Sequence, residues 1–311
     1  MKTYKKILLL VLFLLVAIFF GINTGSTNFS LLDLFSSPAI LHLRMSRVAL
    51  SLLAGAGLGV CGVVLQAILR NPLAEPYLLG VSSGAGFGAV IALILGISSV
   101  YLPVAAFVGA FFSVSLVYVL ASDKRRVESL ILSGVIVAIT FSGITVFLAS
   151  TSQKALHGMM WWLLGSLQVY DLKLLVIVGI IVTIGVFVIF LFGQDLNAIS
   201  IGEEDAVHLG IEIDKVKKIL FVITAFVTGA IVSVCGVIGF VGLIVPHVLR
   251  LAIGPNHRTL LVATCLGSGS FLIFCDTLSR TLFSPIEIPI GVVTSVIGAP
   301  IFIILLKKKG L

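Results

Sequence analysis

The stretch QDLNAISIGEEDAVHLGIEIDKVKK, residues 194–218, interrupts a chain that is otherwise almost continuous hydrocarbon. It contains six of the chain's 13 acidic residues together with three lysines, and it must therefore face water. Acidic side chains favour the positive end of a helix dipole, so the run 203–205 predicts a helix start, and Gly210 is placed to end that helix. A short helix between two apolar spans is suited to docking on a soluble partner. A solvated connecting loop is the alternative interpretation.

The composition on either side of this stretch is that of an integral membrane protein. Hydrophobic residues make up 59% of the 311 residues, charged residues make up 11%, and the mean hydropathy is +1.25. A soluble domain averages about 25% charged residues. One span needs roughly 20 apolar residues, and about ten such stretches follow one another along the chain. We therefore expect an all-α polytopic membrane fold with about ten transmembrane helices, forming a single domain over residues 1–311.

The expected spans can be placed along the chain from its polar breaks. The run 219–253 is too long for one span and is expected to fold back near Gly236–Gly239, which makes its second helix short. A short amphipathic piece is expected at Phe29–Phe35, and a basic cytosolic turn at Asp123–Glu128. The expected spans are 7–22, 44–69, 78–96, 104–121, 129–150, 172–192, two within 219–253, 259–279 and 288–306.

The basic residues predict the orientation of these spans. With both termini in the cytosol, fifteen of the 20 basic residues fall on the cytosolic side, as the positive-inside rule requires. This bias explains the net charge of +7 without a nucleic-acid partner. The five basic residues on the outer side are Arg44, Arg47, Lys154, Lys173 and Arg280.

Several kinds of chemistry have no sequence signal. There is no G-x-x-x-x-G-K-[ST] phosphate loop and no H-E-x-x-H motif, so neither ATP binding of that type nor a zinc site of that type is expected. The acidic residues of the apolar regions, Glu75, Asp276 and Glu287, lie close to span ends, whereas ion-driven carriers usually need a carboxylate near the membrane midplane. We expect no catalytic residues, no metal and no cofactor, and a secondary transporter is the less favoured alternative.

The cysteines carry no ligand pattern either. All four lie inside apolar spans without C-x-x-C spacing, so we expect small core residues rather than disulfides or metal ligands. They are Cys61, Cys235, Cys265 and Cys275.

Five motifs, in order along nearly the whole chain, resemble a known family. The chain is similar to the membrane permease subunit of binding-protein-dependent ABC importers for iron–siderophore complexes, haem or vitamin B12, of the FecCD type. The motifs are Arg44–Arg47 with the Gly-rich span after it, RNPLAEPYLLGVSSG at 70–84, WLLGSL at 162–167, GFVGLIVPH at 239–247 through Arg250, and EIPIG at 287–291 through GAP at 298–300.

This resemblance implies an assembly in a bacterial or archaeal cytoplasmic membrane. It implies a homodimer with the pathway at the two-fold interface, two ATP-binding cassette ATPase subunits on the cytosolic face and a solute-binding protein outside. The chain itself would be no enzyme. The substrate, among an iron–siderophore complex, haem and cobalamin, is left open.

The resemblance also implies roles for particular residues. A cytosolic gate would form at Asn71 and Leu73. The binding protein would dock on Arg44, Arg47 and Arg280, for which anchoring of a helix at the interface is the alternative, with Asp276 as an i,i+4 partner of Arg280. Coupling to the ATPase would fall to Glu203, Glu204, Asp205, Ala206, Leu209 and Gly210. Ser46 and Val237 depart from the family pattern, since proline is frequent at both positions.

Overall fold

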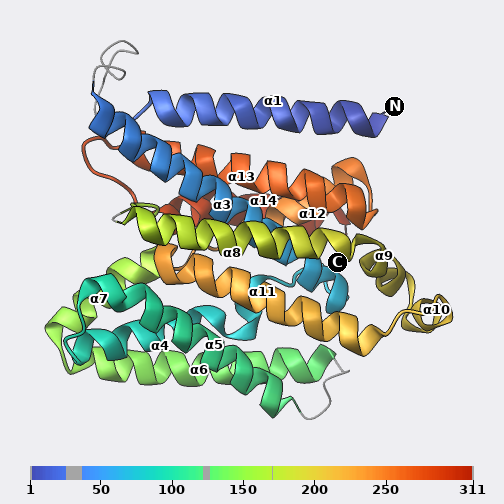
Figure 1. Ribbon diagram of the computed structural model, residues 1–311, viewed down its shortest axis with the longest axis horizontal. Helices are drawn as coiled ribbons and strands as arrows, with labels where there is room; N and C mark the ends of the chain where they lie inside the picture. The colour runs from blue at the N-terminus through green and yellow to red at the C-terminus, as the bar shows by residue number, and fades with distance from the viewer. Residues whose placement is uncertain (1, 26–36, 122–126, 170, 310–311) are drawn as a thin grey trace.

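The computed structural model describes residues 2–25, 37–121, 127–169 and 171–309. These residues form a bundle of helices that run back and forth between two ends (Figure 1), and the described ranges contain no strand. Seven helices are long and apolar enough to cross a membrane, and three shorter apolar helices accompany them. The predicted all-α fold with about ten transmembrane helices is confirmed.

The helices connect as the apolar pattern predicts, with three additional helices in the connections. The long apolar helices are α1 (Lys2–Asn23), α3 (Pro38–Ile68), α5 (Leu102–Leu120), α6 (Val127–Ser150), α8 (Leu172–Leu191), α11 (Ile213–Cys235) and α13 (His257–Thr281). The shorter apolar helices are α4 (Val81–Ile94), α12 (Val241–Ile253) and α14 (Ile290–Lys309). The connections contain α7 (Gln153–Leu164), α9 (Gly193–Ile201), α10 (Glu203–His208) and the 3₁₀ turns η1 (Pro76–Leu79) and η2 (Ser99–Tyr101).

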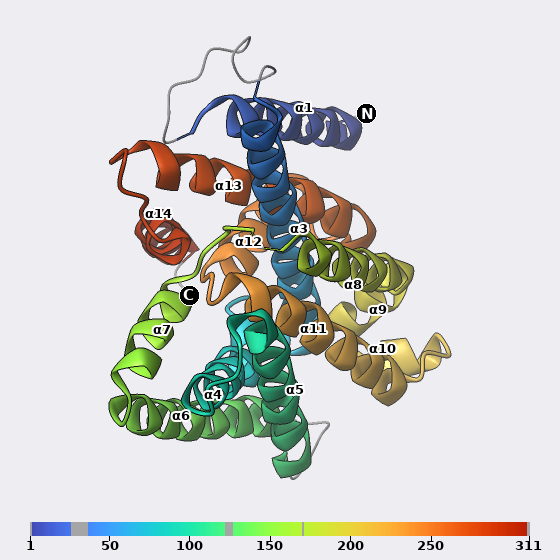
Figure 2. The same cartoon turned by 60° about the vertical axis from the view of Figure 1, so that its left-hand side comes forward.

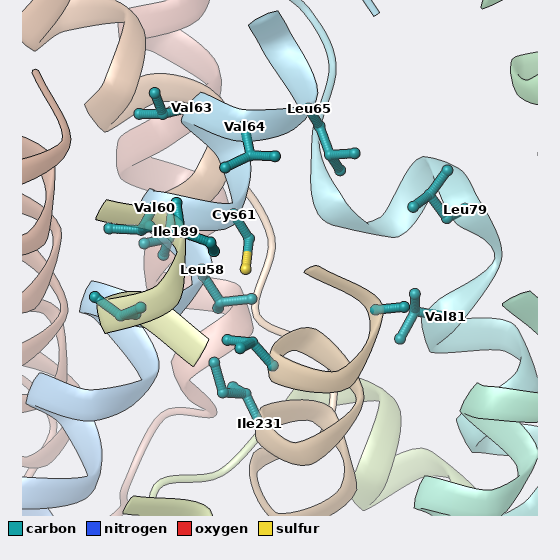
Figure 3. Packing of buried hydrophobic residues seen from close by; sticks show 14 of the residues in the cluster. Leu58, Val60, Cys61, Val63, Val64, Leu65, Leu79, Val81, Ile189 and Ile231 are labelled. Atoms are coloured by element: carbon teal, nitrogen blue, oxygen red, sulfur yellow. The ribbon is translucent and has the colours of Figure 1, made fainter. Parts of the chain in front are cut away.

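Helix α3 is the centre of the bundle, with α8, α11, α12 and α13 packed against it (Figure 2). Its side chains meet Ile189 of α8 and Ile231 of α11 in one continuous hydrophobic core (Figure 3). Glycines let the backbones approach closely, since a Cβ at Gly62 would lie 1.9 Å from the carbonyl oxygen of Gly242. Close approach of this kind replaces the hydrophobic driving force that is missing between helices in lipid.

The fold-back between α11 and α12 occurs where the sequence predicts it. Gly236 has φ +68° and Phe240 has φ 70°, so the chain reverses through two residues with positive φ. The Tyr77 hydroxyl donates to the Ile238 carbonyl (3.0 Å) and accepts from the Ile238 amide (3.1 Å), which fixes the turn against η1. α12 has only 13 residues, as expected for a helix that starts inside the bundle.

Some predicted boundaries were wrong. The helix predicted from residue 44 begins two turns earlier, because Pro38 occupies its first turn, where its missing N–H costs nothing. Arg280, which lies just beyond the predicted span 259–279, belongs to the last turn of α13. The predicted piece Phe29–Phe35 and most of the turn Asp123–Glu128 lie outside the described residues. The four cysteines are free, and three of them are buried, as predicted for core residues.

Candidate functional site

The predicted short helix in the polar stretch is α10, at the end of the bundle that also holds α9 and the N-terminus (Figure 1). It starts at Glu203 after Gly202, whose extended backbone (φ −178°) breaks it from α9. Three acidic residues occupy its first turn, where their negative charge interacts favourably with the partial positive charge of the helix N-terminus. The predicted helix start is therefore confirmed.

Gly210 ends α10 by a Schellman motif. Its own N–H donates to the Val207 carbonyl (2.9 Å), and the next N–H, of Ile211, donates to the Ala206 carbonyl (3.1 Å). This pair of bonds requires a left-handed residue, and Gly210 has φ +80°. The predicted helix stop is confirmed, and the chain continues from this turn into α11, which begins at Ile213.

The surface of α10 combines acidic and apolar side chains. Ala206 is buried against the neighbouring helices, whereas Val207 and Leu209 are 60% and 71% exposed. Glu204 and Asp205 are exposed beside them. Together with the start of α11, this helix borders a groove of about 700 Å³. We name the exposed side chains of α10 and of the residue that follows it (Glu204, Asp205, Val207 and Leu209) the α10 surface.

Glu203, whose side chain is 41% exposed, lies at the edge of this surface and takes part in ion pairs. Its Oε1 lies 2.8 Å from Nζ of Lys217, whose side chain is only 13% exposed, and 3.8 Å from Nη2 of Arg70. Arg70 also donates to the Ile199 carbonyl (3.3 Å) in α9. Glu203 therefore ties α10 to α11, whereas its longer and more exposed contact with Arg70 places it beside the loop after α3. The sequence predicted Lys217 and Arg70 only as basic residues on the cytosolic side, because a long-range pairing leaves no signal in a single sequence.

Asn71 and Leu73 lie in the loop that follows Arg70, at the same end of the molecule. The Asn71 side-chain oxygen accepts from the Leu73 N–H (2.9 Å), which closes a tight turn. The Leu73 side chain is 40% exposed in the single subunit. The predicted gate residues are thus brought together, and Arg70 connects them to α10 through Glu203.

The three predicted outer arginines lie together at the opposite end, and all are turned inward. Arg47 bridges Oδ1 of Asp276 and Oε2 of Glu287, each at 2.8 Å. Arg280 approaches the other oxygen of Asp276 at 3.1 Å, the i,i+4 pair considered as an alternative from the sequence. Asp276 is completely buried. This cluster joins α3, α13 and the loop before α14.

The remaining donors of these arginines hold the end of α1. Arg44 donates to the carbonyls of Ile22 (3.1 Å) and Asn23 (3.0 Å), while Arg280 donates to those of Gly21 (3.0 Å) and Thr24 (3.2 Å). A helix C-terminus leaves such carbonyls without intrahelical partners. The two side chains are only 7% and 3% exposed. In this subunit they anchor α1, and a role in docking stays a prediction.

Glu287 is the part-exposed member of the cluster, in the loop between α13 and α14. Its partial burial alone would raise the pKa of this carboxyl. The hydrogen bond and charge of the Arg47 guanidinium outweigh that effect and lower the pKa below its ordinary value. The Gln168 amide, which donates a hydrogen bond to the carboxylate (3.2 Å), lowers the pKa further. The carboxylate therefore stays ionised at neutral pH.

Known proteins match this architecture over most of its length. The sequence profile of the FecCD transport family matches residues 9–308. The cobalamin import system permease protein BtuC of Halobacterium salinarum is 39% identical, covering 86% of this chain and 73% of its own length. The hemin transport system permease protein HmuU of Yersinia pestis is 33% identical, covering 86% and 83%. A solved metal-chelate type ABC transporter in an inward-facing conformation superimposes with a TM-score of 0.90 at 30% identity, covering 98% of this chain and 99% of that one.

Proposed function

The chain belongs to the FecCD transport family and is a permease subunit of an ABC importer, and from that premise we propose that α10 couples it to a separate ATPase. The proposed complex contains two copies of this chain, two ATP-binding cassette subunits on the face of α9 and α10, and a solute-binding protein at the other end. The proposed cargo is an iron–siderophore complex, haem or cobalamin.

The observation that carries this proposal is the construction of α10. Its Schellman end and the Glu203–Lys217 ion pair fix its orientation on the bundle. The apolar side chains of Val207 and of Leu209, which directly follows the helix, are exposed, where a solvated linker would instead present polar groups. A rigid helix with exposed apolar side chains supports docking into a groove on a soluble partner. We therefore favour a docking helix over a connecting loop.

The connection from α10 to the loop 70–73 suggests how docking would reach the pathway. Glu203 of α10 faces Arg70, and Arg70 immediately precedes the proposed gate residues Asn71 and Leu73. A shift of α10 driven by the ATPase would therefore move or release this loop. In a homodimer, two copies of Leu73 would narrow the cytosolic end of the pathway.

The outer arginines fit the proposed docking of the binding protein only with rearrangement. Arg44, Arg47 and Arg280 are satisfied within the subunit, so an acidic partner would have to compete with Asp276, Glu287 and the carbonyls of α1. Such competition would loosen the outer ends of α1, α3 and α13. We propose that contact with the binding protein acts on the transporter through this exchange of partners.

Uptake by reconstituted proteoliposomes tests the proposal. Vesicles containing the chain and its ATPase subunit, with the binding protein outside, are offered radiolabelled cyanocobalamin, haem and a ferric siderophore separately. We expect uptake of one of these that requires internal ATP and continues after proton and sodium gradients are collapsed. Gradient-driven uptake by the chain alone would identify the alternative, a secondary carrier, and would refute the proposal.

A further inference from the structure

An exposed apolar loop connects α13 to α14 at the end of the bundle opposite α10 (Figure 2). We name residues 282–286 the outer loop; all five are exposed and none is charged. Its large side chains, Leu282, Phe283 and Ile286, are 57%, 67% and 72% exposed. Exposed apolar side chains concentrated in this way are typical of an interaction site, whereas single ones need no explanation.

Hydrogen bonds hold the outer loop in one shape. The Ile286 N–H donates to the Phe283 carbonyl (2.9 Å), which closes the turn. At the base of the loop the Ile288 N–H donates to the Ser279 carbonyl (3.0 Å), and the Ser279 hydroxyl donates to the Ile288 carbonyl. The apolar side chains therefore project from a preorganised turn, and a partner that binds them pays little entropy for ordering the loop.

Glu287 places the outer loop beyond the hydrocarbon core of the membrane. This residue directly follows the loop, and its carboxylate is ionised at neutral pH with 30% of the side chain exposed. An ionised carboxylate that is open to its surroundings lies in water and not in lipid. The length of α13 agrees with this position, because its 25 residues extend over about 37 Å and the hydrocarbon core is about 30 Å thick. The apolar side chains of the loop therefore face water or lipid headgroups unless a protein covers them.

The outer loop is accessible to a partner, whereas the neighbouring arginines are occupied. Arg44 and Arg280 are 7% and 3% exposed and hold the end of α1. Arg47 is paired with Glu287 at 2.8 Å. A protein that covers the loop and brings a basic side chain to the exposed edge of Glu287 would compete directly for this ion pair.

We propose that the outer loop is the first contact of the solute-binding protein, which receives it in an apolar pocket bordered by a lysine or arginine. This proposal rests on the proposed function, which supplies a soluble partner at this end of the bundle. Phe283 is the central anchor, since aromatic side chains are enriched in the buried core of protein interfaces. The basic side chain of the partner pairs with Glu287 and thereby releases Arg47. Docking on the loop thus starts the exchange of ion-pair partners in the arginine cluster.

Binding of the solute-binding protein to the full-length permease–ATPase complex in nanodiscs tests this proposal. We expect Phe283→Ser and Ile286→Ser each to weaken binding at least tenfold, as truncation of an interface anchor does. Val100→Ser is the matched control for Ile286→Ser and should bind as the wild type does. Val100 is also β-branched and is 58% exposed in η2. It lies at the same end, because it lines a cavity together with Gln168, which contacts Glu287.

Photo-cross-linking tests the same contact without removing the aromatic ring. A benzoylphenylalanine that replaces Phe283 should capture the solute-binding protein, and the same probe at Val100 should not. Capture of lipid alone would assign the loop to the membrane surface, and capture of this chain would assign it to a contact within or between subunits. Either result would overturn the proposal.

The wild-type complex separates this proposal from the function on which it rests. If the wild type binds the solute-binding protein and imports cargo while both loop variants bind equally well, only the docking role of the outer loop is refuted. If the wild type binds no solute-binding protein, the proposed function is refuted together with it.

Discussion

Replacement of Gly210 by alanine tests most closely what holds the α10 surface, the proposed coupling site, in place. Gly210 has φ +80°, and a Cβ at this position would meet no atom within 4 Å. The cost of the change is therefore backbone strain alone, about 1–2 kcal/mol for a residue other than glycine in left-handed conformation. That cost falls on the Schellman turn, so it weakens α10 locally and leaves the bundle intact.

A matched control lies at the other end of the same helix. Gly202 has an extended backbone with φ −178°, which any residue adopts, and the nearest contact of an added Cβ would be the flexible carboxylate of Asp205 at 3.0 Å. Gly202→Ala should therefore cost little. Both variants add one methyl group next to α10, and they differ in the conformation that the methyl group must accept.

Hydrogen exchange followed by mass spectrometry is the appropriate assay. A local cost of 1–2 kcal/mol corresponds to a factor of about 5–30 in an opening equilibrium. We expect the amides of α10 to exchange about 5–30 times faster in Gly210→Ala than in the wild type, with α3 unchanged and Gly202→Ala close to the wild type. Equal exchange in the two variants would refute the argument that the left-handed turn holds α10 in place.

Three further variants test the packing and the ion cluster. Asp276→Asn should lower the free energy of unfolding by about 3–5 kcal/mol, because it removes the buried counter-charge of Arg47 and Arg280. Thermal unfolding measures this loss, and a loss no larger than that of Glu287→Gln would contradict the prediction. Gly62→Ala should sharply reduce the yield of folded protein measured by size-exclusion chromatography, because the added Cβ would lie 1.9 Å from the Gly242 carbonyl oxygen. Gly143→Ala should be tolerated, because no atom lies within 4 Å of the added Cβ. Because folding lowers the pKa of Glu287, this residue stabilises the fold above its unfolded pKa of about 4.5, and that contribution disappears as the pH falls through the lower folded value. The wild type should therefore lose stability on acidification below that pH more steeply than Glu287→Gln, and parallel pH profiles would contradict the assignment.

Much of the fold was predictable, because the composition of a segment shows whether it can form a membrane-spanning helix. Apolar runs of the required length predicted the spans. The fold-back was predicted from the excess length of 219–253 and from the glycine at 236. Local signals placed α10 equally well, since its start and stop depend on neighbouring residues only. By contrast, α9 was missed, because its mixture of polar and apolar residues has no clear periodicity in nine residues.

The arrangement of side chains between distant segments was not predictable. Arg47 meets Glu287 across 240 positions in the sequence, and Arg280 meets the end of α1 across more than 250. A single sequence shows that these arginines are present at span ends but not which carbonyls and carboxylates surround them. The surroundings of Arg250 are hidden for the same reason, since only the packed structure shows that its Nε and Nη2 atoms are buried without a hydrogen-bond partner among the described residues.

Site-specific photo-cross-linking in the assembled complex tests the central claim most directly. A benzoylphenylalanine replaces Leu209, which directly follows α10 and is 71% exposed. In a second variant it replaces Ile286, which is 72% exposed at the opposite end. We predict that the probe at 209 captures the ATPase subunit and that the probe at 286 does not. Capture of the ATPase from position 286, or none from position 209 while the complex remains intact, would contradict the assignment of α10 as the coupling helix.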